Sequence, residues 1–107
     1  MIDTQSECSV TLTAGADGAR LHVAGELVAT TAAVLEIALD RCLRERPATV
    51  AVDLSQVRFM DAAGISALLR HRHRAARHGT HLVVTSLNPF LIRLIRPEVR
   101  ALLTAAR

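Results

Sequence analysis

The sequence is poor in aromatic residues and contains no lysine. There is no Trp or Tyr, and Phe59 and Phe90 are the two phenylalanines. The core must therefore be aliphatic, and few side chains could stack on the bases of a single-stranded nucleic acid. No apolar run approaches the roughly 20 residues of a membrane span, and the polar, acidic start MIDTQSECSV does not look like a secretory signal. We expect a cytoplasmic protein that binds no nucleic acid and does not insert into a membrane.

The sequence also lacks the residue patterns of metal sites and of common catalytic centres. Cys8 and Cys42 are isolated, without metal-ligand spacing. Two reduced thiols are the default interpretation, and a disulfide between them is the alternative. On a helix His71 and His73 point apart, and His71 and His78 are two turns apart, too far to share one ion. No Gly-x-Ser-x-Gly motif or phosphate-binding loop is present. We expect no metal, no cofactor and no enzymatic activity.

Charge is divided unevenly along the chain. The net charge is +3, but residues 1–53 carry 4 − 8 = −4 and residues 54–107 carry 9 − 2 = +7. All 13 basic residues are Arg, which suits bidentate pairing with carboxylates and phosphates. The densest cluster covers residues 70–74 together with Arg77 and His78. Its default interpretation is a solvated outer helix face, and the alternative is contact with an acidic partner or with lipid headgroups.

The length of 107 residues predicts one domain, residues 1–107, with residues 1–6 as a loose tail. Alternation and turn residues predict strands over residues 8–13, 20–23, 49–54 and 81–85, the first two forming a hairpin. Helical spacing predicts helices from Thr30 or Thr31, either of which can be the cap, to about residue 46, and over residues 62–78, 88–95 and 98–106. This order gives an α/β fold in which helices pack on a small mixed sheet, with right-handed crossovers between parallel strands.

The most informative stretch is residues 50–69, VAVDLSQVRFMDAAGISALL. It reads as a buried strand, then a loop over residues 55–60, then an amphipathic helix that begins after Asp61. We expect Phe59 and Met60 in the core. Asp61 is a typical N-cap, and free backbone N–H groups at such a helix start suit an anion or a polar group of a partner. Ala62 and Ala63 stand there without a hydroxyl, which favours a binding module over an enzyme.

This stretch resembles the central motif of STAS domains, the fold of bacterial anti-sigma factor antagonists. Three further segments fall in the family's order. Residues 25–27 (GEL), followed by Thr30 or Thr31, look like the stretch before its first helix. Residues 79–84 (GTHLVV) look like its fourth strand, and residues 88–95 (NPFLIRLI) like its third helix. The resemblance covers about residues 8–96.

The resemblance implies binding to an anti-sigma factor, usually a serine kinase of the histidine-kinase-like ATPase fold, so that a sigma factor is freed. In the family that kinase phosphorylates a Ser or Thr at the start of the second helix. Asp61 and Gly64 match the family's Asp and Gly, Ala62 takes the first small or hydroxyl position, and Ala63 takes the phosphorylated one. Val28 stands where many members have an acidic residue.

From these positions we expect a partner-binding face without a phosphoswitch, in which Ala63 cannot be phosphorylated. Its predicted residues are Val28, Thr30, Thr31, Ser55, Asp61, Ala62, Ala63 and Gly64. Ser55 and Ser66 are possible displaced phosphosites, although ordinary solvated or locally bonded hydroxyls are the favoured interpretation. Two other functions stay open: a STAS accessory subunit that binds the ATPase subunit of a lipid-transport ABC system, and a scaffold domain in a larger signalling complex.

Overall fold

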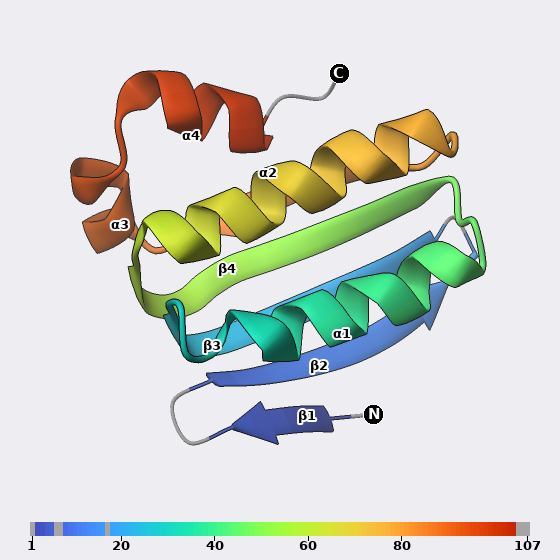
Figure 1. Ribbon diagram of the computed structural model, residues 1–107, viewed down its shortest axis with the longest axis horizontal. Coiled ribbons are helices and arrows are strands. Elements are labelled where there is room, and N and C mark those ends of the chain that lie inside the picture. Colours follow the sequence, from blue (N-terminus) through green and yellow to red (C-terminus); the bar gives the residue numbers. More distant parts are fainter. Residues whose placement is uncertain (1, 6–7, 17, 105–107) are drawn as a thin grey trace.

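In the computed structural model, the described residues form one mixed sheet and four helices (Figure 1). The structure describes residues 2–5, 8–16 and 18–104. The strands are β1 (Ile2–Gln5), β2 (Cys8–Gly15), β3 (Gly18–Leu27), β4 (Thr49–Met60) and β5 (His81–Leu87). The helices are α1 (Ala32–Arg44), α2 (Ala62–Arg77), α3 (Pro89–Leu94) and α4 (Pro97–Thr104).

The spatial order of the strands is the same as their order in the chain, β1-β2-β3-β4-β5. β1–β2 and β2–β3 pair antiparallel, whereas β3–β4 and β4–β5 pair parallel. The two parallel connections contain α1 and α2, which lie side by side over the same face of the sheet (Figure 1). The predicted hairpin and the predicted α/β fold with a mixed sheet are therefore confirmed.

The core lies between this sheet face and the two long helices. Alternate strand residues point into it and are fully buried, for example Leu21, Val52 and Leu54. Leu35 of α1 and Leu68 of α2 pack against them and are also fully buried. An aliphatic core of this kind matches the expectation from the shortage of aromatic residues.

Two predicted segment boundaries were wrong because strand pairing overrides the local pattern. Residues 2–5 of the predicted loose tail form β1, which pairs with β2; residues 1 and 6 lie outside the described residues. Residues 55–60, predicted as a loop, continue β4 and pair with the end of β3. The β3–β4 register shifts twice there, which breaks the alternation that would have revealed a strand.

The helix predictions agree with the structure to within a few residues. α2 ends at Arg77, and Gly79 follows with φ = 81°, a left-handed conformation that favours glycine. α1 ends at Arg44, two residues before the predicted end. The last predicted helix, residues 98–106, corresponds to α4, with residues 105 and 106 outside the described part.

Candidate functional site

Asp61 links the start of α2 to the turn that precedes α1. It occupies the N-cap of α2 in an extended conformation, and its Oδ1 accepts a hydrogen bond from the Gly64 N–H at 3.0 Å. Its Oδ2 accepts a second one from the Ala29 N–H at 3.2 Å. The predicted cap is therefore confirmed, and the same carboxylate also joins two segments 32 residues apart in the chain.

These hydrogen bonds favour the ionised form of Asp61. The bond from the Gly64 N–H contributes most to lowering the pKa of the carboxyl below its ordinary value; slight desolvation opposes this, and the bond from Ala29 adds to it. The site therefore carries a fixed negative charge at neutral pH. The carboxylate already accepts hydrogen bonds from two backbone N–H groups, those of Gly64 and Ala29.

Gly64 allows the first turn of α2 to lie directly against the end of β3. A Cβ at this position would collide with the Leu27 carbonyl oxygen and would stand 3.0 Å from the Leu27 Cγ. The Asp61 N–H also donates to the Leu27 carbonyl, at 3.3 Å. Gly64 is buried, so it positions the helix start and offers little surface to a partner.

Thr31 stands at the N-cap position of α1, but its side chain does not cap the helix. Its hydroxyl donates to the Glu26 carbonyl at 2.6 Å and accepts from the Val28 N–H at 3.0 Å. The predicted capping role was therefore wrong for Thr31, because the Glu26 carbonyl of β3 and the Val28 N–H take up its hydroxyl. The side chain is buried and fixes the shape of the turn over residues 28–31, in which Thr30 is exposed.

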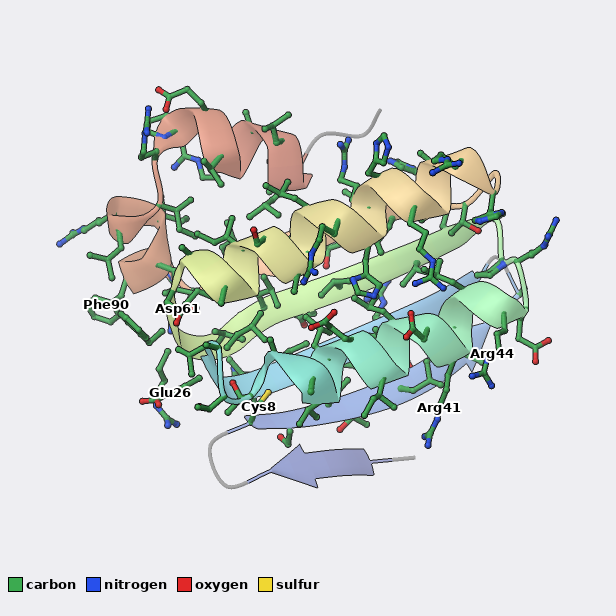
Figure 2. All side chains as sticks on the ribbon, viewed as in Figure 1. Cys8, Glu26, Arg41, Arg44, Asp61 and Phe90 are labelled. Atoms are coloured by element: carbon green, nitrogen blue, oxygen red, sulfur yellow. The ribbon has the colours of Figure 1, made fainter. Side chains whose placement is uncertain are left out.

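The structure brings most of the predicted partner-binding residues to one end of the molecule. The exposed Ala62 and half-buried Ala63 open α2, and the Asp61–Ala29 bond holds that helix start against the turn containing Val28 and Thr30. Figure 2 shows Asp61 at this end, together with Glu26 and Phe90, while Arg41 and Arg44 lie at the other end. We call residues 28–31 and 61–63 the α2 platform. A partner-binding role for them stays a prediction.

Ser55 does not join the α2 platform. It lies within β4, six residues before Asp61, which at about 3.3 Å per residue is roughly 15–20 Å along the strand. Its backbone N–H donates to Asp53 Oδ1 at 2.9 Å. Ser66 lies on α2 with an exposed side chain.

The predicted core position of Phe59 was wrong, whereas that of Met60 was correct. Met60 is 7% exposed and Phe59 is 45% exposed. Sequence reasoning also missed the Ala29 N–H as a donor to Asp61. No local pattern marks that backbone group, since only the tertiary fold brings it to the carboxylate.

The basic cluster of α2 finds its acidic counterpart within the chain. Arg74 Nη1 lies 3.0 Å from Asp40 Oδ1, and Arg70 Nη2 lies 3.5 Å from Glu36 Oε2, both carboxylates belonging to α1. His71, which is buried, also approaches Asp40 Oδ1, at 3.3 Å from Nε2. Exposed arginine pairs of this kind stabilise by at most about 1 kcal/mol. The side chains of Arg70 and Arg74 are 64% and 56% exposed, so the predicted solvated face is confirmed for them, whereas the buried His71 lies against Asp40 of α1.

Other reactive groups do not assemble into a centre in the part of the chain that the structure describes. Cys8 and Cys42 are free thiols, and burial raises the pKa of both. Among the described residues no three His, Cys, Asp or Glu side chains gather to hold a metal ion. No described helix is long and apolar enough to cross a membrane.

Comparison with solved structures finds three proteins of similar fold. An anti-sigma factor antagonist from Mycobacterium paratuberculosis superposes with a TM-score of 0.74 at 22% identity, over 87% of this chain and 79% of that one. An antisigma-factor antagonist STAS domain from Rhodobacter sphaeroides gives 0.65 at 21% identity, over 82% of this chain and 92% of that one. The structure of Mglu superposes with a TM-score of 0.63 at 23% identity, over 74% of this chain but 19% of that one.

At these identities the likeness establishes the fold. No curated protein sequence matches the chain. A family model does match: the one described as "Mlab, STAS domain" covers residues 10–98, which run from within β2 to the first two residues of α4 and include the whole α2 platform. The chain therefore belongs to the STAS domain family.

Proposed function

We propose that this protein is a non-enzymatic, cytoplasmic anti-sigma factor antagonist of a bacterium. It binds an anti-sigma factor of the serine-kinase type through the α2 platform and so frees a sigma factor. The observation that carries the proposal is the double hydrogen bond of Asp61. Because one carboxylate holds both the α2 start and the turn before α1, the two segments present one preformed surface.

The composition of this surface supports binding without a phosphate switch. Ala62 and Ala63 carry no oxygen that could accept a phosphoryl group, and Val28 adds an apolar side chain beside them. A phosphate here would add nearly two negative charges and three acceptors. It would stand next to the Asp61 carboxylate, whose charge would repel it. Without an acceptor at this position, the start of α2 keeps one charge state while the kinase is active.

The test introduces a hydroxyl at position 63, where the family has its phosphorylated residue. Purified wild-type protein and the Ala63→Ser and Ala62→Ser variants are each incubated with purified host anti-sigma kinases and ATP, and phosphate incorporation is followed by mass spectrometry. We expect phosphate on Ala63→Ser alone, followed by loss of kinase binding. Ala62→Ser is the matched control, because it adds the same hydroxyl one residue earlier on the same helix.

Two results would contradict the proposal. Stoichiometric phosphate on wild-type protein, at Ser55 or Ser66, would show that a switch exists elsewhere. Failure of wild-type protein to bind any host anti-sigma factor, together with binding to the ATPase subunit of a lipid-transport ABC system, would assign the alternative function. Isothermal titration with each purified partner distinguishes the two functions.

A further inference from the structure

α3 exposes apolar side chains on its outer face. Among the described residues, the large exposed hydrophobic side chains are Ile37, Phe59, Phe90, Ile92, Leu94 and Leu102, and three of these belong to the short α3. Phe90 is 72% exposed and Leu94 is 66% exposed, the two highest values in this set. A surface helix normally places polar residues on its outer face, so this arrangement calls for an explanation.

The geometry of α3 fixes these two side chains in place. Leu91, which is fully buried, anchors the inner face, and the buried Ile95 follows directly after the helix. Phe90 and Leu94 are four residues apart and therefore lie together on the opposite, outer side. The Asn88 side chain accepts a hydrogen bond from the Phe90 N–H at 2.9 Å, so the residue that presents the ring is held at the helix start.

This apolar surface adjoins the α2 platform. α3 packs against β4, and β4 ends directly before Asp61. Figure 2 shows Phe90 and Asp61 at the same end of the molecule. Phe59, near the end of β4, adds a half-exposed ring two residues before Asp61. We call Phe90 and Leu94 the α3 patch; a partner seated on the platform would reach it without a change of fold.

The charges around the α3 patch indicate what kind of partner fits. Arg93 lies between its two residues in the chain and is exposed, whereas the carboxylates at this end of the molecule, Asp61 and Glu26, lie outside α3. Glu98 lies 3.3 Å from Arg96, and Asp61 already accepts two backbone hydrogen bonds. A second copy docked about a twofold axis would bring arginine against arginine. A partner with an apolar anchor flanked by carboxylates is favoured instead.

We propose that the α3 patch binds an apolar side chain on a carboxylate-flanked helix of the same anti-sigma factor that docks on the α2 platform. This inference rests on the proposed function and adds a second contact to it. Aromatic residues at well-packed positions are typical binding hot spots, which makes Phe90 the expected dominant residue. Arg93 supplies charge complementarity beside it.

The test compares matched surface variants in binding to the purified anti-sigma factor. We expect Phe90→Ser to weaken binding about 30-fold, the change that a hot spot of about 2 kcal/mol gives. Leu94→Ser and Arg93→Glu should weaken it less. Ile37→Ser and Leu102→Ser are the controls, because each removes a half-exposed apolar side chain from α1 or α4, and neither should change the affinity.

Each outcome decides one question. If wild-type protein binds but Phe90→Ser and Leu94→Ser bind equally well, the α3 patch proposal is wrong while the proposed function stands. If wild-type protein binds no anti-sigma factor, the proposed function fails and the patch proposal fails with it. If wild-type protein dimerises in analytical ultracentrifugation and Phe90→Ser is monomeric, the occupant is a second copy, which also overturns the proposal. Circular dichroism confirms that the variants are folded.

Discussion

Gly64→Ala tests whether the start of α2 depends on close contact with β3. Helix propensity alone predicts that Ala at this position stabilises the protein by about 1 kcal/mol. The structure predicts the opposite sign, because the new Cβ would collide with the Leu27 carbonyl oxygen and stand 3.1 Å from the Leu27 carbonyl carbon. A backbone carbonyl cannot rotate away as a side chain can, so the helix start or the strand end must move.

The expected change in the free energy of unfolding follows from these two effects. Overpacking of a buried position costs about 1–3 kcal/mol, and a collision with backbone belongs near the upper value. After subtraction of the propensity gain of about 1 kcal/mol, the net loss is about 2 kcal/mol. For a domain of this size that corresponds to a fall in Tm of about 8–16 °C. Separation of α2 from Leu27 would also strain the Asp61–Ala29 hydrogen bond and so weaken partner binding.

Urea unfolding and thermal melting monitored by circular dichroism measure this loss. Gly15→Ala is the control, because the nearest heavy atom to its new Cβ is the Gly18 carbonyl oxygen at 3.7 Å, an ordinary contact distance. We expect the control to change stability by less than about 0.5 kcal/mol. If Gly64→Ala is as stable as the wild type or more stable, the close approach of α2 to β3 is refuted, and with it the geometry of the α2 platform.

Two further predictions concern titratable groups. The pKa of Asp61 is lowered chiefly by the Gly64 N–H, and that of Asp53 chiefly by the Ser55 N–H. Both carboxylates therefore stabilise the folded state above about pH 4, the pKa range of an unfolded Asp. This stability is lost as the pH falls through the lower pKa values of the folded state. Asp61→Asn should therefore show a smaller loss of stability than wild-type protein when urea midpoints at neutral and acid pH are compared; an equal loss would contradict this. Cys8 and Cys42 are buried with raised pKa values, so they should react with a thiol reagent much more slowly in the native state than in urea. Equal rates in the two conditions would show that the thiols are accessible.

Local patterns predicted those parts of the fold that local physics determines. The N-cap at Asp61 and the left-handed Gly79 set the limits of α2, and both are visible as residue types in the sequence. The alternation of apolar and polar residues likewise predicted β2 and the first half of β4. It failed over residues 55–60 because the register shifts opposite the end of β3 remove the twofold period there.

The candidate site was predictable in its residue types but not in its contacts. Asp61 was recognised as a cap, yet its second hydrogen bond goes to Ala29, whose N–H no sequence pattern distinguishes. Thr31 has the residue type of a cap, but the Glu26 carbonyl receives its hydroxyl. Phe59 is apolar and was expected in the core, yet it points to the opposite side of β4 from the buried Met60 and is 45% exposed. The Ala29 bond spans 32 residues, and the Glu26 carbonyl lies five residues before Thr31, but neither backbone group is marked by a residue type.

If the proposed function holds, a start of α2 without a phosphorylatable residue changes where control of binding must lie. In a switched antagonist a kinase can alter the affinity by adding charge at the helix start. Ala62 and Ala63 remove that possibility at the start of α2, and the two hydrogen bonds of Asp61 hold this helix start against the turn before α1. If the proposed function holds, occupancy of the anti-sigma factor then depends on the concentrations of the two proteins and on their fixed affinity. An apolar second contact such as the α3 patch suits such a system, because it raises affinity without adding a group that a kinase could modify.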